Sequence, residues 1–181
     1  MEEQDRLFLS GKWSVCGYKQ GTVIVGDSVT TQTDNGWFIG RPIETPTEPE
    51  FEFCGHNLIT ATGQALVGNM LIDVTSYDTG LTYHAIGTTS TAVASGDGTL
   101  GGEHKRLTVT SKSRSNNVLT YSTFYTATQS AVSVEEAGMF GHETANASAD
   151  TGILFSHYLT HVDNASGLYD LTFNYYLTLG A

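Results

Sequence analysis

The stretch SGDGTLGGEHKR, residues 95–106, carries the spacing G-x-G-x-x-G at Gly96, Gly98 and Gly101. This spacing can cradle a dinucleotide pyrophosphate when a strand leads into it and a helix begins at its end. Here Leu107 and Val109 alternate with polar residues directly afterwards, which predicts a strand. The sequence therefore excludes a dinucleotide site and predicts a mobile surface loop between two strands.

Two histidine-containing stretches have the residue types of a metal site. His157 and His161 in HYLTH have the i, i+4 spacing of zinc ligands on a helix. The surrounding residues predict a strand, on which four residues span about 13 Å, so the two rings share a face but cannot bind one ion. His142 and Glu143 stand in a polar loop, and Asn146 occupies the position where H-E-x-x-H needs its second histidine. We expect no metal and no cofactor.

The carboxylates and thiols also lack the pattern of a catalytic site. Glu135 and Glu136 are adjacent, so on a strand they point to opposite faces and cannot act together on one substrate. One of them must face inward, where a buried carboxylate needs a partner. Cys16 and Cys54 are predicted to be free, buried thiols, with a disulfide as the alternative. The chain has no G-x-S-x-G, and we expect no enzymatic activity.

The charge balance narrows the choice of partners. The 181 residues include 8 Lys and Arg against 19 Asp and Glu, which gives a net charge of −11. Such a surface repels nucleic-acid phosphates and anionic lipid headgroups, so we expect neither nucleic acid nor membrane as a partner. No apolar run approaches the roughly 18 residues of a membrane-spanning helix, and the acidic start MEEQDRLF does not resemble a signal peptide. We expect assembly in the cytoplasm.

Residues 1–55 are predicted to form an N-terminal arm. TVIV and SVTT flank Gly26-Asp27 and predict a β-hairpin. Residues 41–53 follow and hold all three prolines of the chain, which predicts an extended linker. The candidate partner-binding residues of this linker are Arg41, Pro42, Pro46 and Pro49.

Residues 56–181 are predicted to form an antiparallel β-sandwich or jelly roll. One short helix is expected over residues 60–72, with Thr60 as its cap, because apolar residues recur there with a period near 3.6. Its glycines, Gly63 and Gly68, weaken the helix, so it should pack against a sheet. In residues 168–179, LYDLTFNYYLTL, apolar and polar residues alternate, which predicts a strand with one buried face. Asn116-Asn117 predicts a hairpin turn.

Half of the basic residues gather within ten positions, at Lys105, Arg106, Lys112 and Arg114. On one continuous strand the last three would share a face. That face is either solvated or forms a stripe that meets acidic residues of a neighbouring copy or of a partner. Lys105, Lys112 and Arg114 are therefore candidate partner-binding residues.

Four short motifs run through residues 57–181: Asn-x-Ile-x-x-x-Gly, Ile-Gly-Thr, Leu-x-x-Glu-x-x-Arg and Glu-x-Gly-x-Phe. In that order they fall on Asn57, Ile59 and Gly63; on Ile86, Gly87 and Thr88; on Leu100, Glu103 and Arg106; and on Glu136, Gly138 and Phe140. With these motifs the chain resembles a family of small virion proteins of tailed bacteriophages, described as minor structural, head-decoration or tail-fibre-like.

This resemblance implies a non-enzymatic virion protein that is present in many copies and is trimeric. It also implies an ion pair between Arg106 and Glu136 that joins two strands. Our first expectation is a capsid decoration, or cement, protein that binds the outer shell and bridges subunits of the major capsid protein, with the proline-rich arm lying across them. The alternative is a tail-associated fibre or receptor-binding module that recognises a cell-surface glycan, with Trp13 and Trp37 as stacking platforms. A carbohydrate-active enzyme ranks third because no carboxylate pair is present.

Overall fold

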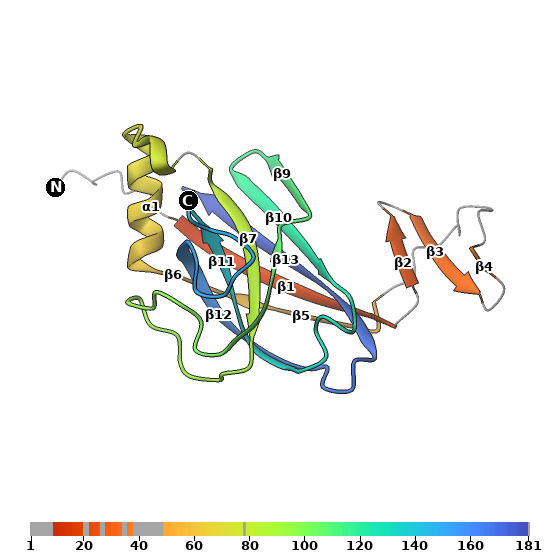
Figure 1. Ribbon diagram of the computed structural model, residues 1–181. Coiled ribbons are helices and arrows are strands. Elements are labelled where there is room, and N and C mark those ends of the chain that lie inside the picture. The colour runs from red at the N-terminus through yellow and green to blue at the C-terminus, as the bar shows by residue number, and fades with distance from the viewer. Residues whose placement is uncertain are drawn as a thin grey trace.

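Alternating apolar and polar residues build two antiparallel sheets of five strands each, which form a β-sandwich (Figure 1). The structure is a computed structural model and describes residues 9–19, 22–25, 28–33, 36–37, 49–77 and 79–180. The first sheet has the order β5-β1-β13-β10-β9, with the bounds Phe51–His56, Leu9–Lys19, Tyr169–Leu179, Val118–Tyr125 and Ser111–Ser115. The second has the order β6-β12-β11-β7-β8, with the bounds Leu58–Ile59, Ile153–Asp163, Ser133–Gly141, Leu81–Gly87 and Glu103–Thr108. The predicted fold class is confirmed.

Strand β13 lies at the centre of the first sheet and has the predicted alternation. Its buried hydrophobic residues are Leu171, Phe173, Tyr175 and Leu177. Strand β1 pairs along the whole of β13, from Leu9 opposite Leu179 to Lys19 opposite Tyr169. The first sheet therefore contains strands from both sides of the boundary expected at residue 55.

Aromatic side chains fill the space between the two sheets. Trp13 of β1 is 6% exposed and stacks on Tyr158 of β12, with ring centroids 5.2 Å apart. Trp13 is thus a core residue, and its predicted role as a surface stacking platform is wrong. The side chain of Trp37 lies outside the described part of the chain.

The core also encloses one histidine with a defined set of partners. The Tyr125 hydroxyl donates to the backbone oxygen of His84 at 2.7 Å and lies 2.9 Å from its Nδ1, while the Tyr158 hydroxyl lies 2.7 Å from Nε2. Because Tyr125 has already donated its proton, Nδ1 must be the donor and Nε2 accepts from Tyr158. Burial lowers the pKa of His84 to about 3, so the ring is neutral.

Helix α1, Ala61–Leu71, packs on β12 and is followed by the short 3₁₀ helix η1, Thr75–Tyr77. As predicted, Thr60 caps the helix: its Oγ1 accepts from the Gly63 N–H at 2.9 Å. Gly63 is buried, and a Cβ added there would lie 2.2 Å from the backbone oxygen of Phe155. The helix can approach β12 this closely because position 63 has no side chain.

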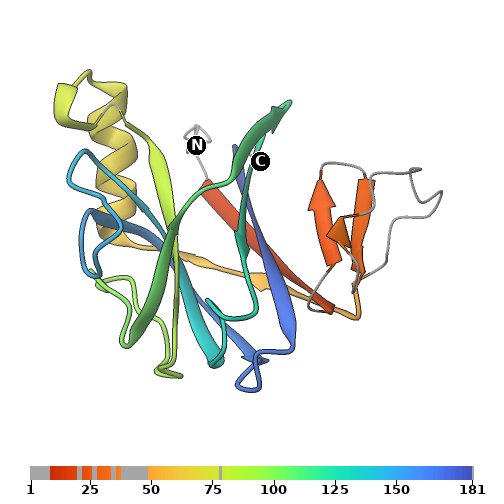
Figure 2. The same ribbon diagram turned by 45° about the vertical axis from the view of Figure 1, so that its right-hand side comes forward.

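Strands β2, β3 and β4, with the bounds Thr22–Val25, Ser28–Thr33 and Gly36–Trp37, form a separate antiparallel sheet inserted between β1 and β5. The predicted hairpin is present as the β2–β3 pair. Figure 2 shows α1 at one side of the sandwich and this small sheet at the other. Pro49 lies two residues before the start of β5, whereas the other candidate partner-binding residues of the linker, Arg41, Pro42 and Pro46, lie outside the described residues.

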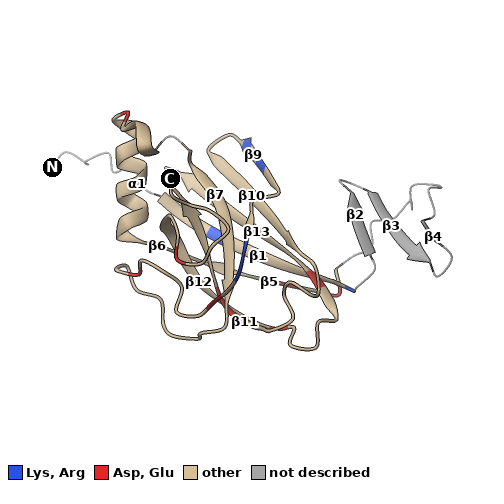
Figure 3. Cartoon of the chain, in the orientation of Figure 1, with Lys and Arg blue, Asp and Glu red and all other residues tan. Residues whose placement is uncertain are grey.

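The predicted basic stripe is wrong, because its residues lie on two strands in different sheets. The Val109 N–H donates to Thr82 of the second sheet at 2.9 Å, and the Thr110 N–H donates to Ser122 of the first sheet at 2.7 Å. The chain therefore changes sheets between two consecutive residues. Arg106 of β8 is buried and Lys105 is half-buried, while the basic residues of β9 are exposed at the sheet edge (Figure 3); these are Lys112 and Arg114.

Two glycines of α1 should respond oppositely to the same substitution. Gly63→Ala places a Cβ against the Phe155 backbone. It should lower the free energy of unfolding by about 1–3 kcal/mol, the usual cost of overpacking. Gly68 is exposed and a Cβ there meets no atom within 4 Å, so Gly68→Ala should raise stability by about 0.5–1 kcal/mol. Urea melts of the two variants measure the difference; equal effects would contradict the close packing of α1 on β12.

Candidate functional site

Two loops cover the outer face of the second sheet, the loop of residues 88–102 between β7 and β8 and the loop of residues 142–152 between β11 and β12. An apolar cluster beneath them includes Leu100 from the first loop and Phe140 from β11. Gly138 makes room for Leu100, whose Cδ2 would lie 3.1 Å from an added Cβ. Polar side chains on this face are therefore buried and need partners of their own.

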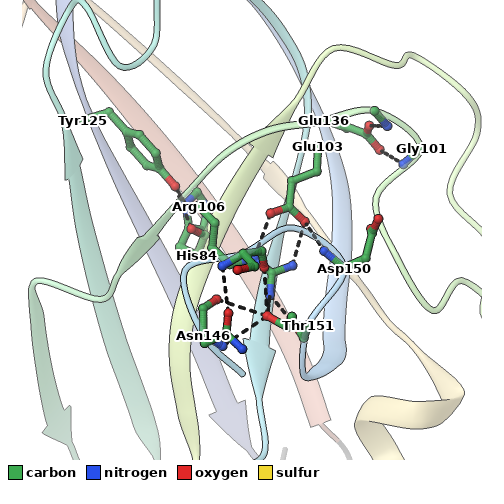
Figure 4. Close-up of polar contacts among 11 residues, drawn as sticks. His84, Gly101, Glu103, Arg106, Tyr125, Glu136, Asn146, Asp150 and Thr151 are labelled. Carbon is green, nitrogen blue, oxygen red and sulfur yellow. Dashed lines mark hydrogen bonds and ion pairs between the residues drawn. The ribbon is translucent and has the colours of Figure 1, made fainter. Parts of the chain in front are cut away.

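The Glu136 carboxylate holds the loop of residues 88–102, which we call the glycine loop. It is 1% exposed, and its two oxygens accept hydrogen bonds from the backbone N–H groups of Gly101 at 3.0 Å and Gly102 at 2.7 Å (Figure 4). The side chain passes over Gly87 of β7, where an added Cβ would lie 2.6 Å from Oε1. The loop that was predicted to be mobile is thus fixed by its own backbone to a buried carboxylate.

A second carboxylate joins this arrangement through His157 of β12. Nε2 of His157 lies 2.9 Å from Oε2 of Glu136, and Nδ1 lies 2.7 Å from Oδ2 of Asp97 in the glycine loop. Ionised carboxylates can only accept, so both contacts are full hydrogen bonds when both ring nitrogens carry a proton. Burial alone would raise the pKa of Asp97, but the Ala94 N–H and His157 outweigh it and lower that pKa.

Arg106 does not pair with Glu136 as predicted, and its ion pair is with Glu103. Nε and Nη2 of Arg106 donate to the two oxygens of Glu103 at 2.8 Å and 2.6 Å, and Nη1 donates to the Thr151 backbone oxygen. The guanidinium also lies over the Phe140 ring, 3.7 Å from its centroid. Strand β7 lies between β8, which carries Arg106, and β11, which carries Glu136. Arg106 and Glu136 therefore each bond to a nearer group instead of to one another. Figure 4 shows Arg106 bonded to Glu103 and to Thr151, while Glu136 turns to Gly101.

The two histidines of HYLTH do not share a face. His157 is buried, whereas the His161 side chain is 60% exposed and bonds Glu135 through Nδ1 at 2.7 Å. The pairing of β11 with β12 is irregular at this point, and His161 has a positive φ of 53°. Glu136 is buried and Glu135 is partly exposed, and each of them takes one of these histidines as its partner.

The hydrogen bonds of the cluster beneath the glycine loop hold this loop in place. A pocket of about 360 Å³ opens there, lined by loop residues together with Asp97, Glu136 and His157. Both nitrogens of His157 and both oxygens of Glu136 already have protein partners. Within the described ranges no group of three His, Cys, Asp or Glu side chains is arranged to hold a metal ion.

The two cysteines are unpaired thiols in different surroundings. Cys16 is buried, as predicted, but Cys54 is exposed, which corrects the prediction for that residue. Burial raises the pKa of the Cys16 thiol, and the nearby charge of Glu52 raises it further, so this thiol resists ionisation.

An apolar surface lies where α1 meets the first sheet. A groove of about 190 Å³ there is lined by residues that include Leu66 of α1, Leu119 of β10 and Leu177 of β13. Beside it Leu71 and Ile72 are 72% and 73% exposed. Exposed apolar side chains that adjoin a groove are typical of a protein contact surface. Across the part of the chain that is described, none of the helices has the length and apolar character to span a membrane.

Comparison of the chain with protein-family models, curated protein sequences and solved structures finds no match.

Breaking the Arg106–Glu103 pair should be costly because the two side chains are 0% and 4% exposed. Arg106→Ala should lower the free energy of unfolding by about 3 kcal/mol or more, since it leaves the Glu103 carboxylate buried without its cation. Arg114→Ala on exposed β9 is the matched control, with an expected loss below about 0.5 kcal/mol. Urea denaturation measures both losses, and equal losses would show that the buried pair contributes nothing.

Asp97 should give the protein a specific acid sensitivity. The pKa of the Asp97 carboxyl is lower in the folded protein than its ordinary value of 3.8. The ionised carboxylate therefore stabilises the folded state when the pH is above that ordinary pKa, and this stabilisation is lost as the pH falls through the lowered pKa. Wild type should therefore exceed Asp97→Asn in stability at about pH 6, and the difference should shrink towards about pH 3. Urea midpoints across this range test it, with exposed Asp73→Asn as a control for the substitution itself; a difference between wild type and Asp97→Asn that does not change with pH would contradict it.

Proposed function

We propose that this protein is a capsid decoration protein of a tailed bacteriophage, which binds the outer shell through its N-terminal arm and bridges neighbouring subunits of the major capsid protein. The proposal joins the motif resemblance of residues 57–181 to the architecture of the arm. In this function the protein acts by binding and catalyses no reaction.

The proposal rests on the arm, which here means the inserted residues 20–48 between β1 and β5. Strands β2–β4 form a sheet that no strand of the sandwich joins within the described residues. Both ends of the insertion are anchored in the first sheet, since Gly17 lies opposite Phe51 and its oxygen accepts from the Glu50 N–H at 2.8 Å. An extended segment held at both ends can lie across a partner and add strands to an exposed sheet edge.

The buried polar clusters support a structural function. Glu136, His157 and Asp97 hold one loop, and Arg106 with Glu103 holds the other. These groups hold the two loops on the surface of the second sheet, and both ring nitrogens of His157 and both oxygens of Glu136 are engaged in doing so. A rigid body that presents an arm suits a protein that has to bridge fixed positions on a shell.

Other surfaces are available for contact with further copies or with the shell. Strand β5 is an edge strand of the first sheet, and the apolar groove beside α1 lies on the same sandwich. The net charge of −11 favours the outside of a particle over its DNA-facing interior.

Deleting the arm tests this function. A variant in which Asn-Gly replaces residues 20–48 should retain the thermal unfolding of the sandwich, because β1 and β5 are adjacent and antiparallel. Its affinity for shells assembled from the major capsid protein of the same phage should fall at least tenfold, as measured by co-sedimentation. Wild type should saturate the shells at a fixed number of copies, with a solution mass three times the 19.4 kDa of one chain.

The Gly68→Ala variant, whose added Cβ meets no atom within 4 Å, serves as a control that leaves the arm intact and should bind shells as wild type does. Equal shell binding with and without the arm would overturn the role of the arm. No binding of wild type to shells, with attachment to tails or to host cells in its place, would favour the receptor-binding alternative.

A further inference from the structure

The outer face of the first sheet differs in chemistry from that of the second. Its outward positions on β13, which alternate with the core residues, are Thr172, Asn174, Tyr176 and Thr178, all partly exposed. The cross-strand register places small polar residues beside them, such as Thr120 of β10 opposite Tyr176 and Ser14 of β1 opposite Asn174. The result is a face rich in hydroxyl groups with few charges.

A depression of about 420 Å³ lies in this face across β5, β1 and β13. The residues that line it are Lys12, Trp13, Ser14, Glu52, Cys54, Gly55, His56 and Tyr176. The register arranges them in adjacent rows: His56, Lys12 and Tyr176 form one row, and Cys54 and Ser14 belong to the next.

Ser14 supplies an unused hydrogen-bonding group at this place. The residue is 5% exposed, and its Oγ has no hydrogen-bond partner among the described residues. A buried hydroxyl without a partner is unfavourable, and it can both donate and accept. A ligand hydroxyl seated in the depression would satisfy it.

The charged side chains around Ser14 are also available to a ligand. Lys12 lies opposite His56, and Glu52 lies opposite Cys16, so the cation and the carboxylate are about 13 Å apart along the strands by strand geometry. No ion pair of the described residues includes either of them. The depression therefore combines donors at one end with an acceptor at the other, and its net charge is close to neutral.

This combination favours one class of ligand. Separated donors and acceptors beside a partly exposed tyrosine ring match the hydroxyl groups and the apolar face of a sugar. A phosphate group would find a single cation among the lining residues, Lys12, which is a poor match for its charge. We propose that the depression formed by Lys12, Ser14, Glu52, Cys54, His56 and Tyr176 binds a neutral saccharide. This site goes beyond shell binding and does not depend on where the protein lies in a virion.

Titration of the ¹⁵N-labelled full chain with maltotriose, triacetylchitotriose and galactotriose tests the site by NMR. One of these sugars should give saturable shifts of the amide signals of residues 12–14 and 54–56, with a dissociation constant on the order of 1 mM. Tyr176→Ala should weaken binding at least tenfold. Ser14→Ala should weaken binding by about 2- to 10-fold, the loss of one hydrogen bond, without lowering the unfolding midpoint, because the hydroxyl it removes has no protein partner.

Thr178→Ala is the matched control, since Thr178 lies on the same strand and face but outside the depression. It should bind the sugar as wild type does. The proposal is overturned if no sugar gives saturable shifts, if Tyr176→Ala leaves them unchanged, or if sodium phosphate or free lysine binds the depression more tightly. Arm deletion, which removes shell binding, should leave these shifts in place.

Discussion

A buried carboxylate must be satisfied by protein groups, and the outer face of the second sheet is organised around how Glu136 meets this requirement. Two backbone N–H groups of the glycine loop and one nitrogen of His157 converge on its oxygens. Charge-assisted hydrogen bonds of this kind are stronger than neutral ones. Because the donors come from a loop and from a neighbouring strand, satisfying one charge fixes the loop, and Leu100 is then held over the apolar cluster beneath it.

Three of the four sequence motifs meet on this face, and their residues have complementary roles. Gly87 leaves space for Glu136, Gly138 leaves space for Leu100, and Phe140 supports the guanidinium of Arg106. Arg106 has a similar role with a positive charge. It holds the loop of residues 142–152 by donating a hydrogen bond to the backbone oxygen of Thr151. The motifs thus encode the attachment of two long loops, which explains why their polar residues are buried and already partnered.

Most of the elements could be predicted from local patterns, whereas the pairing of charges could not. The alternation in β13 and the Thr60 cap each depend on residues close in sequence. Two of the wrong predictions, the basic stripe and the shared face of His157 and His161, involve a break in strand geometry. The alternation of apolar and polar residues continues through Val109, although the chain changes from one sheet to the other there. The irregular pairing of β11 with β12 near His161 turns this side chain away from the face expected for it. The Glu103–Arg106 spacing of three is present in the motif, but on a regular strand those residues point to opposite faces.

The attachment of the small sheet has a mechanical consequence. The insertion leaves from the end of β1 and returns at the start of β5, so any pull on it acts at one end of two neighbouring antiparallel strands. Figure 1 shows the small sheet beyond those strand ends, so the pull runs close to the strand axes. Strand β1 is paired over its whole length with β13, and sliding it loads all of these hydrogen bonds together instead of one after another. The sandwich is therefore loaded in shear at this point, the direction in which a β-sheet best resists force.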